Sequence, residues 1–553
     1  MTSLFDHLAA KVARFHARRV DARFRRALGQ VAAEQERVLR RVLRLVADSE
    51  FGRQHALRAV RTFADLRRAV PIRTYEDYRP YVDRLCAGDT GALFAPGTRI
   101  LMFATSSGTT AEPKRIPVTP EFVQDYRRGW NIFGLKLLSD QPRALLRAIL
   151  QVTARHDVER TAAGIPCGAI TGLLARTQKR IVRRFYVGRP ELTQIEEPRA
   201  RYYTLMRLGI ARDVAFAITA NPATLIQMAR VADEESEALI RDVRDGTLGT
   251  RFVPDATLRA VLSQRLSPNP SRAAALERLK NAQGTLRPRA YWQLEFLACW
   301  TGGSMGHYLA RLADWWGPVP VRDIGLLASE GRVSIPLENG TPAGVLDVQG
   351  GVFEFIPAAE ADRPTATTLG YDEVEIGSDY VVVLTNSSGL VRYRLDDVVR
   401  VRGRLEGAPV IEFLHRAGRV ASIAGEKLTE SQAVEAVRSV SKAFQLPEFD
   451  FIVAPCWGDP PFYRVTTERE LPADFGAALD DALAGQNEEY ASRRKSGRLG
   501  DLCVRVAGRD TFQEFDRALL AVRRRPIEQF KRPCLLTDVG ADEQLGATSP
   551  PRA

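Results

Sequence analysis

The stretch ATSSGTTAEPKRIP, residues 104–117, decides how this chain of 553 residues is interpreted. The apolar residues 100–103 before it predict a short buried strand. Small and hydroxylated residues follow at 106–110, and Lys114 comes shortly after them. Such a loop can turn backbone N–H groups and hydroxyls toward one anion, with the ammonium closing over it. The spacing of a Walker loop is absent. Two interpretations are open here: a phosphate cradle, or a polar surface loop between a strand and a helix.

Length and composition predict a globular chain of two or three domains. Hydrophobic residues make up 45% and charged residues 26%, which is ordinary for a folded protein. No apolar run approaches the roughly 18 residues of a membrane span, and the first residues begin no signal peptide. Six cysteines lie far apart without a C-x-x-C pair, which argues against a zinc site or a disulfide framework. We therefore expect a cytoplasmic protein without a membrane span.

The charge of the chain raises the question of a nucleic-acid partner. The net charge is +12 and the isoelectric point is near 9.6. The arginines, however, are spread through the chain, and no RNP, zinc-finger or K-homology signature accompanies them. A basic surface also steers anionic small molecules such as nucleotides and carboxylates. We expect small-molecule partners and no nucleic acid.

Helical patterns dominate the first half of the chain. Residues 8–48 have apolar positions at helical spacing among many arginines, which predicts one or two long helices. Such a helix could lie on a membrane. We favour the alternative that its apolar side packs on its own domain. Phe51-Gly52 is expected to end this helix. A further helix is expected over 70–88, and Thr119 followed by proline should begin another. Residues 121–280 are predicted to be mostly helical.

From residue 296 the sequence changes to short apolar segments separated by glycine-rich stretches. Residues 380–401 predict a β-hairpin with its turn at 386–389. Strands after helices favour a large α/β domain with an attached β region. The pattern changes again around residues 417–419, and an α+β unit is expected from there to the end, as a separate domain.

Three features could complete a nucleotide site around the loop. Glu330, after an apolar strand and next to glycine, suits a divalent cation bridging phosphates, or is a solvated loop glutamate. Asp396 and Asp397 should face opposite sides of a strand, so that one can bind a ribose diol. The alternative is an ion pair with Arg392, Arg394 or Arg400. Lys427 and Lys531 are lysines where arginine prevails, and each can also be a solvated charge.

No nucleophile constellation competes with these features. The six histidines form no H-E-x-x-H or triad-like grouping. His307, in GGSMGHY, is the most site-like of them, although a single histidine is usually structural.

Several sequence motifs occur together and in order along the chain. They are QERVLRRVL, VPIRTYEDYRPYVDRL, SSGTTAEPKRIP, TGGSMGHY, LLASE, FEFIP, GLVRYRLDDVV, IEFLHR, GEKLTE, RDTFQEF and QFKRP. With them the chain resembles the acyl acid amido synthetases of the auxin-conjugating (Gretchen Hagen) family, within the adenylate-forming superfamily of firefly luciferase. We expect a bacterial member.

The resemblance implies a luciferase-like α/β fold. It implies an adenylation domain at 1–418, with a β-barrel-like region, that binds ATP and an acyl acid, and a mobile α+β lid domain at 419–553. It also implies a monomeric, ATP- and Mg²⁺-dependent ligase. A carboxylic acid would attack the α-phosphate to give an acyl-adenylate and pyrophosphate, and an amino acid or other amine would then form an amide and release AMP.

The resemblance assigns roles by position. Lys114 and the mobile-domain residue Lys531 would be catalytic, and Glu330 would sit by Mg²⁺. The acyl substrate would meet Thr301, Gly302, Met305 and His307. The implied nucleotide-binding residues are Ser106, Ser107, Gly108, Thr109, Thr110, Ser329, Glu330, Asp397 and Arg416.

Two positions depart from the family pattern. Asp396 replaces the glycine of Y-R-x-G-D, and this extra carboxylate would lower affinity for AMP unless it points away or pairs with an arginine. Leu326 stands where the second motif usually has a tyrosine. Two other functions are therefore considered: adenylation that ends in a thioester on CoA or a carrier protein, and a catalytically silent binding protein. The acid and the amine are not predicted.

Overall fold

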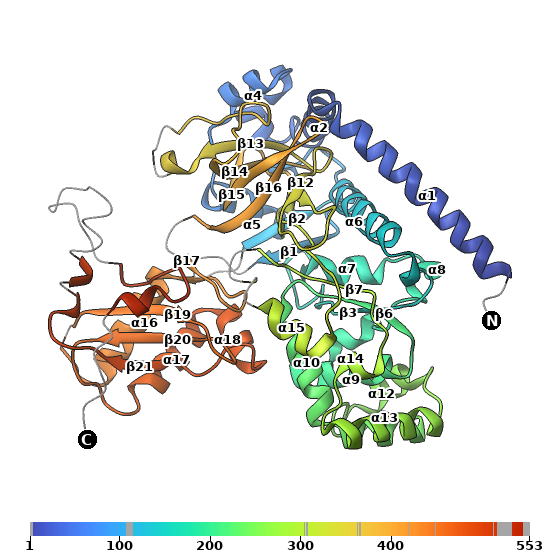
Figure 1. Cartoon of the computed structure of the whole chain (residues 1–553). Helices are drawn as coiled ribbons and strands as arrows, with labels where there is room; N and C mark the ends of the chain where they lie inside the picture. Colours follow the sequence, from blue (N-terminus) through green and yellow to red (C-terminus); the bar gives the residue numbers. More distant parts are fainter. Residues whose placement is uncertain are drawn as a thin grey trace. The chain divides into compact units, whose positions relative to one another are not determined.

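A computed structural model describes residues 4–106, 114–302, 305, 308–361, 363, 366–417, 420–447, 449–512, 514–516 and 533–545. These residues separate into two compact units (Figure 1). The first contains 4–106 and 114–417, and the second contains the described residues from 420 onward. In the described part of the chain, no helix is long and apolar enough to cross a membrane.

The N-terminal helices pack on the core of the first unit. Helices α1 (Leu4–Leu28) and α2 (Val31–Val46) cover the region predicted to be helical, and Val38 and Val42 of α2 are buried in the core, as expected for packing on its own domain. The predicted helix end was wrong. Helix α2 stops at Val46, and Ser49 then begins α3 (Glu50–Gln54) by accepting a hydrogen bond from Gly52 N at 2.9 Å. Helices α4 (Phe63–Ala69) and α5 (Tyr75–Cys86) follow.

The stretch at 104–117 spans two antiparallel strands. Strand β1 (Met102–Ser106) pairs with β2 (Lys114–Val118), and Ser106 lies opposite Lys114. These strands belong to a sheet in the order β2-β1-β5-β4, with β5 at Pro166–Gly168 and β4 at Glu159–Arg160. The loop thus connects two strands, and α6 (Pro120–Asp140) begins only after β2, with Thr119 as its N-cap.

A parallel sheet lies in the following region. Its order is β3-β6-β7-β8, formed by Ala148–Gln151, Val214–Ile218, Phe296–Ala298 and Val321–Arg322. The region 121–280 is mostly helical, as predicted, and β3 and β6 are buried strands within it that the sequence did not predict. The sequence of β6, VAFAI, is wholly buried, and a short apolar run of this kind is equally compatible with a buried helix.

Helices make up most of that region, and α9, α10, α12 and α13 lie below β3 and β6 in the view of Figure 1. Their bounds, with those of the shorter helices, are α7 Ile170–Arg176, α8 Arg180–Arg183, α9 Pro198–Ile210, α10 Pro222–Glu234, α11 Ser236–Asp245, α12 Ala256–Ser263, α13 Pro270–Gln283, α14 Pro288–Tyr291 and α15 Leu309–Trp316.

A six-stranded antiparallel sheet occupies the place of the expected β-barrel-like region. Its order is β11-β12-β16-β15-β14-β13, formed by Ser334–Ile335, Gly344–Leu346, Ala408–Arg416, Tyr393–Leu405, Asp379–Thr385 and Val352–Pro357. The predicted hairpin is confirmed as β14 and β15. A small ribbon, β9 (Leu327–Ala328) with β10 (Gly331–Arg332), carries the LLASE motif.

The second unit is α+β, as predicted for this region. Its three-stranded sheet has the order β19-β20-β21, at Phe451–Cys456, Phe462–Thr467 and Cys503–Val506. Thr429 caps α16 (Glu430–Ala443) after the small ribbon of β17 (Val420–Ala421) and β18 (Leu428–Thr429). Helices α17 (Phe475–Gln486) and α18 (Glu488–Lys495) complete the unit's own core.

Candidate active site

The structure places some of the predicted site residues and not others. Ser107, Gly108, Thr109, Thr110, His307 and Lys531 lie outside the described residues. Ser106 is described through its backbone, as the last residue of β1. The remaining predicted residues all belong to the first unit.

Lys114, Tyr393 and Glu330 form a buried chain of hydrogen bonds. Lys114, the first residue of β2, donates from Nζ to the hydroxyl of Tyr393 at 3.3 Å. That hydroxyl in turn donates to Oε1 of Glu330 at 3.2 Å. The chain joins the end of the loop, the ribbon β9–β10 and strand β15. Sequence reasoning had assigned no role to Tyr393, although it stands in the YRLDD motif.

Two tyrosine rings surround the ammonium of Lys114. Its Nζ lies 5.6 Å from the ring centre of Tyr75 and 5.9 Å from that of Tyr393, within the range of cation–π attraction. Burial raises the pKa of Tyr75 to about 12. Burial, together with the nearby charge of Glu330, raises the pKa of Tyr393 well above its usual value. Tyr393 therefore keeps its proton near neutral pH and can donate it to Glu330.

Ser329 and Glu330 are held by their neighbours on both sides. The Ser329 hydroxyl donates to the carbonyl of Thr105 in β1 at 3.2 Å. The backbone carbonyl of Glu330 accepts a hydrogen bond from Asn386 Nδ2 at 2.6 Å. The side chain of Glu330 is 4% exposed, so its solvated-loop interpretation was wrong. The ribbon is thus fixed to both β1 and the hairpin turn.

Asp397 and Arg416 are cross-strand neighbours on β15 and β16. Burial alone would lower the pKa of Arg416, but the carboxylates of Asp397 and Glu330 outweigh it and raise that pKa. Arg416 therefore stays charged and acts on two of the predicted site carboxylates. It is the last residue of β16, directly before the boundary between the two units.

Asp396 shows how the chain accommodates its departure from the family glycine. Its φ of +64° lies in the left-handed region, which favours glycine and is best tolerated by asparagine and aspartate among other residues. Its carboxylate accepts a hydrogen bond from Arg394 Nε at 2.6 Å. Asp397 beside it is buried. The ion-pair interpretation therefore holds for Asp396, and Asp397 remains the candidate for the ribose.

The predicted substrate residues follow β7 at its carboxyl end. Thr301 donates from its backbone N and its hydroxyl to Asp323 Oδ2, at 2.6 and 2.8 Å. Asp323 follows β8 and also accepts from Gly325 N at 2.6 Å. Met305 is buried, and a Cβ at Gly302 would lie 3.2 Å from the carbonyl of Phe413. Ligands of parallel α/β sheets bind at such strand ends.

Asp323 was missed by sequence reasoning, although the apolar strand just before it could have signalled it. Burial raises the pKa of Asp323 against the opposing hydrogen bonds from Gly325 and Thr301. It connects the Thr301 loop with the segment that leads to Leu326 and Glu330.

Family models cover most of the chain. The GH3 family N-terminal domain matches residues 21–321, the GH3 family central domain 344–416, and the GH3 family C-terminal domain 431–539. The chain belongs to the GH3 family. The resemblance found in the sequence is thereby confirmed.

Relatives of this GH3 protein are amido synthetases. It is 28% identical to the jasmonoyl–L-amino acid synthetase GH3.5 of Oryza sativa subsp. japonica, over 91% of this chain and 92% of that protein. It is also 28% identical to the probable indole-3-acetic acid-amido synthetase GH3.12 of the same plant, over 90% of each. The predicted enzyme class is therefore that of the curated family members.

A solved structure confirms the predicted fold. The GH3.15 acyl acid amido synthetase superposes with a TM-score of 0.64 at 22% identity, covering 93% of this chain and 92% of that one. The GH3 protein thus has the mixed α/β fold of that enzyme.

Proposed function

We propose that this GH3 protein is an ATP-dependent acyl acid amido synthetase that adenylates a carboxylic acid and transfers the acyl group to an amino acid or other amine. The observation that carries the proposal is the convergence of Lys114, Tyr393, Glu330, Asp397 and Arg416 in one unit. Two cations and two carboxylates, which arise from four separate strands or turns, lie among buried side chains. Such an arrangement suits phosphate transfer, which depends on positioning and charge neutralisation.

The phosphates of ATP belong at the loop that begins with Ser106. Its hydroxyls and N–H groups, at Ser107, Gly108, Thr109 and Thr110, would bind the phosphate oxygens, and Lys114 would neutralise their charge. Lys114 is suited to this role because β2 and the two tyrosine rings fix its ammonium at the base of the loop. Lys531 would add a second cation during adenylation, as the resemblance implies.

The donor set at Glu330 fits Mg²⁺. Carboxylate oxygen is a ligand that Mg²⁺ prefers, and Mg²⁺ commonly takes one or two carboxylates and completes its shell with phosphate oxygens and water. Among the described residues, no group of three or more histidine, cysteine or acidic side chains is placed to hold a metal ion. When bound, Mg²⁺ would neutralise phosphate charge. Tyr393 orients the Glu330 carboxylate for it.

The ribose belongs at Asp397. Each carboxylate oxygen can accept a hydroxyl hydrogen bond from the diol. Arg416, its cross-strand neighbour on β16, places a positive charge beside Asp397, and Arg394 holds the additional carboxylate of Asp396. The departure at Asp396 is therefore compatible with nucleotide binding.

The acyl acid belongs near Thr301, Gly302, Met305 and His307. Adenylation and amide formation would be shared between residues 1–418 and a lid at 419–553 that rotates near 417–427. We further propose a cytoplasmic monomer; the six cysteines are free thiols, as suits a reducing compartment.

Pyrophosphate exchange with a panel of carboxylic acids tests the proposal. We expect exchange that depends on one class of acid, and an acyl-adenylate that amino acids consume and CoA does not. Consumption by CoA alone would favour the thioester alternative. A lack of exchange with every acid, together with retained ligand binding, would favour the silent binding protein.

A further inference from the structure

The turn that joins β14 to β15 contacts the backbone of Glu330. Asn386, the first residue of this turn, is 2% exposed and donates from Nδ2 to the Glu330 carbonyl at 2.6 Å. Its Oδ1 accepts hydrogen bonds from the backbone N and the hydroxyl of Ser388, at 3.0 and 2.6 Å. Because both of these donors occupy Oδ1, the amide has one satisfied orientation, with its NH₂ group toward Glu330. The turn thus holds Glu330 through a defined hydrogen bond.

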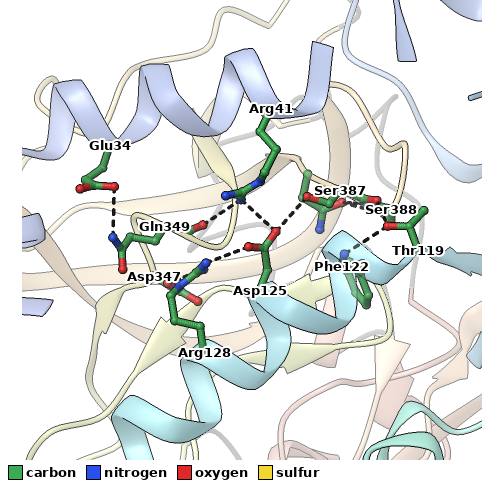
Figure 2. Close-up of polar contacts among 12 residues, drawn as sticks. Glu34, Arg41, Thr119, Phe122, Asp125, Arg128, Asp347, Gln349, Ser387 and Ser388 are labelled. Carbon is green, nitrogen blue, oxygen red and sulfur yellow. Dashed lines mark hydrogen bonds and ion pairs between the residues drawn. The ribbon is translucent and has the colours of Figure 1, made fainter. Parts of the chain in front are cut away.

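The same turn is anchored to the first turns of α6 (Figure 2). The Ser387 hydroxyl donates to Asp125 Oδ2 at 2.8 Å, and the Ser387 carbonyl accepts from the Thr119 hydroxyl at 2.8 Å. Thr119 is also the N-cap of α6, accepting from Phe122 N. Asn386 is therefore followed directly by a residue, Ser387, that is hydrogen-bonded to a helix beginning just after β2.

Two arginines fix the anchoring carboxylate. Asp125 accepts from Arg41 Nη2 of α2 at 2.9 Å and from Arg128 Nη1 of α6 at 2.7 Å, and the three side chains lie together in Figure 2. Arg41 also donates to the carbonyl of Gln349 at 3.1 Å. Buried, charge-assisted networks of this kind allow little movement because any displacement leaves a charge unpaired. The turn therefore rests on a rigid support of two helices.

Gly331, the residue after Glu330, leaves room for the side chain of Asn386. A Cβ at Gly331 would lie 2.8 Å from Asn386 Nδ2, which is closer than side-chain carbons approach other atoms. Any other residue at 331 would push the Asn386 amide away. The hydrogen bond from Asn386 to Glu330 therefore depends on glycine at position 331.

We propose that Asn386 is a positioning residue that holds Glu330 for the Mg²⁺-bound phosphates of ATP, with Ser387 and Asp125 as its support. The inference rests on the proposed function. The Glu330 carboxylate points toward Tyr393 and Lys114 only if its backbone stays in place at the turn between β9 and β10. The hydrogen bond from Asn386 supplies that restraint, because it acts on the carbonyl of Glu330 itself.

Binding of MgATP by calorimetry, with Mg²⁺ varied, tests the inference. Asn386→Asp keeps the shape and Oδ1 but removes the donor to Glu330. Ser388→Ala is the matched control, because it removes one hydrogen bond of the same turn and leaves that donor in place. We expect the first variant to weaken MgATP binding about tenfold or more, as a lost buried hydrogen bond does. We expect the second to change it less than about threefold, and thermal unfolding of each variant shows that it is folded.

A double-mutant cycle separates positioning from general damage. If Asn386 acts through Glu330, the effect of Asn386→Asp disappears in the Glu330→Ala background. Additive effects of the two substitutions, or equal effects of Asn386→Asp and Ser388→Ala, would overturn the positioning role alone. Wild-type protein that binds no MgATP would overturn the proposed function and this inference together. Asn386→Ala, which adds no charge, should reproduce the loss.

Discussion

Glu330 in the first unit and Glu426 in the second are both buried glutamates that accept a hydrogen bond from a tyrosine. The tyrosine is Tyr393 for Glu330, at 3.2 Å, and Tyr463 for Glu426, at 2.5 Å. Each stands in a short motif after apolar residues, LLASE or GEKLTE. Their other partners differ.

Glu426 is occupied by its own loop. Its two oxygens accept from the backbone N of Ile423 and of Ala424, both at 2.8 Å. Burial raises its pKa against these hydrogen bonds. Glu330 instead has the cations Lys114 and Arg416 nearby, brought from β2 and β16. Burial and a tyrosine partner are therefore common to both glutamates. Their other neighbours, backbone N–H groups for Glu426 and cations for Glu330, separate the proposed binding carboxylate from one held by its own loop.

The largest expected effect is on adenylation by Glu330→Gln. We expect single-turnover acyl-adenylate formation to fall about a hundredfold or more, because Glu330 would hold the Mg²⁺ that neutralises the phosphate charge, and the loss of one contact that stabilises transition-state charge costs roughly 3 kcal/mol. Glu426→Gln is the matched control and should keep the rate per folded molecule within about threefold. An unchanged rate in Glu330→Gln would abolish the distinction between the two glutamates.

Lys531→Ala tests whether the second unit also contributes a catalytic side chain, because the resemblance assigns Lys531 to adenylation. We expect adenylation to slow about a hundredfold, for the same loss of transition-state charge stabilisation. Lys442→Ala is the control, because Lys442 is an exposed lysine in the last turn of α16 with no assigned role in adenylation. Normal single-turnover adenylate formation in Lys531→Ala would remove the lysine from the catalytic set.

Asp397→Ala and Asp396→Ala test which of the two neighbouring carboxylates binds the ribose. We expect the Michaelis constant for ATP to rise about tenfold, since hydrogen bonds to charged groups contribute about 1.5–3 kcal/mol. Asp396→Ala should change it little, because Arg394 already pairs with that carboxylate. Steady-state kinetics at varied ATP decide the matter. If Asp396→Ala alone raises the constant, the ribose lies on the other face of β15.

The smallest expected effect is a pH dependence of stability. The folded pKa of Glu426 is raised above its ordinary 4.5, so its contribution to stability is present at low pH and is lost as pH rises through the folded pKa. We expect the stability advantage of wild type over Glu426→Gln to shrink as the pH rises from about 4 to neutrality. Denaturant unfolding at several pH values measures it. An advantage that grows with pH would mean that the loop stabilises the charged carboxylate.

Much of the fold could be predicted because its signals are local. Thr119 begins a helix as predicted, since an N-cap needs only a hydroxyl beside the first turn. The hairpin was recognisable from β-branched strands around a turn. The buried strands β3 and β6 were not predicted, because a short apolar run has no period that separates a strand from a helix.

For the candidate site too, some features could be predicted from the sequence and others could not. The loop at 104–117, Glu330, Asp397 and the family followed from motifs whose order along the chain was visible. The contacts among them were not, because Lys114 and Tyr393 are 279 residues apart and Glu330 and Asn386 are 56 apart. Only the packing of strands brings such groups within hydrogen-bond distance.

The sequence by itself determined which chemistry is present: a hydroxyl-rich loop, one lysine after it, and carboxylates at 330 and 397. Only the tertiary structure decided that Tyr393 links that lysine to Glu330, that Arg394 holds Asp396, and that Asn386 restrains the Glu330 backbone. The physical reason is that charge and hydrogen-bond energies depend on distance and burial. Distance and burial arise when remote strands pack together.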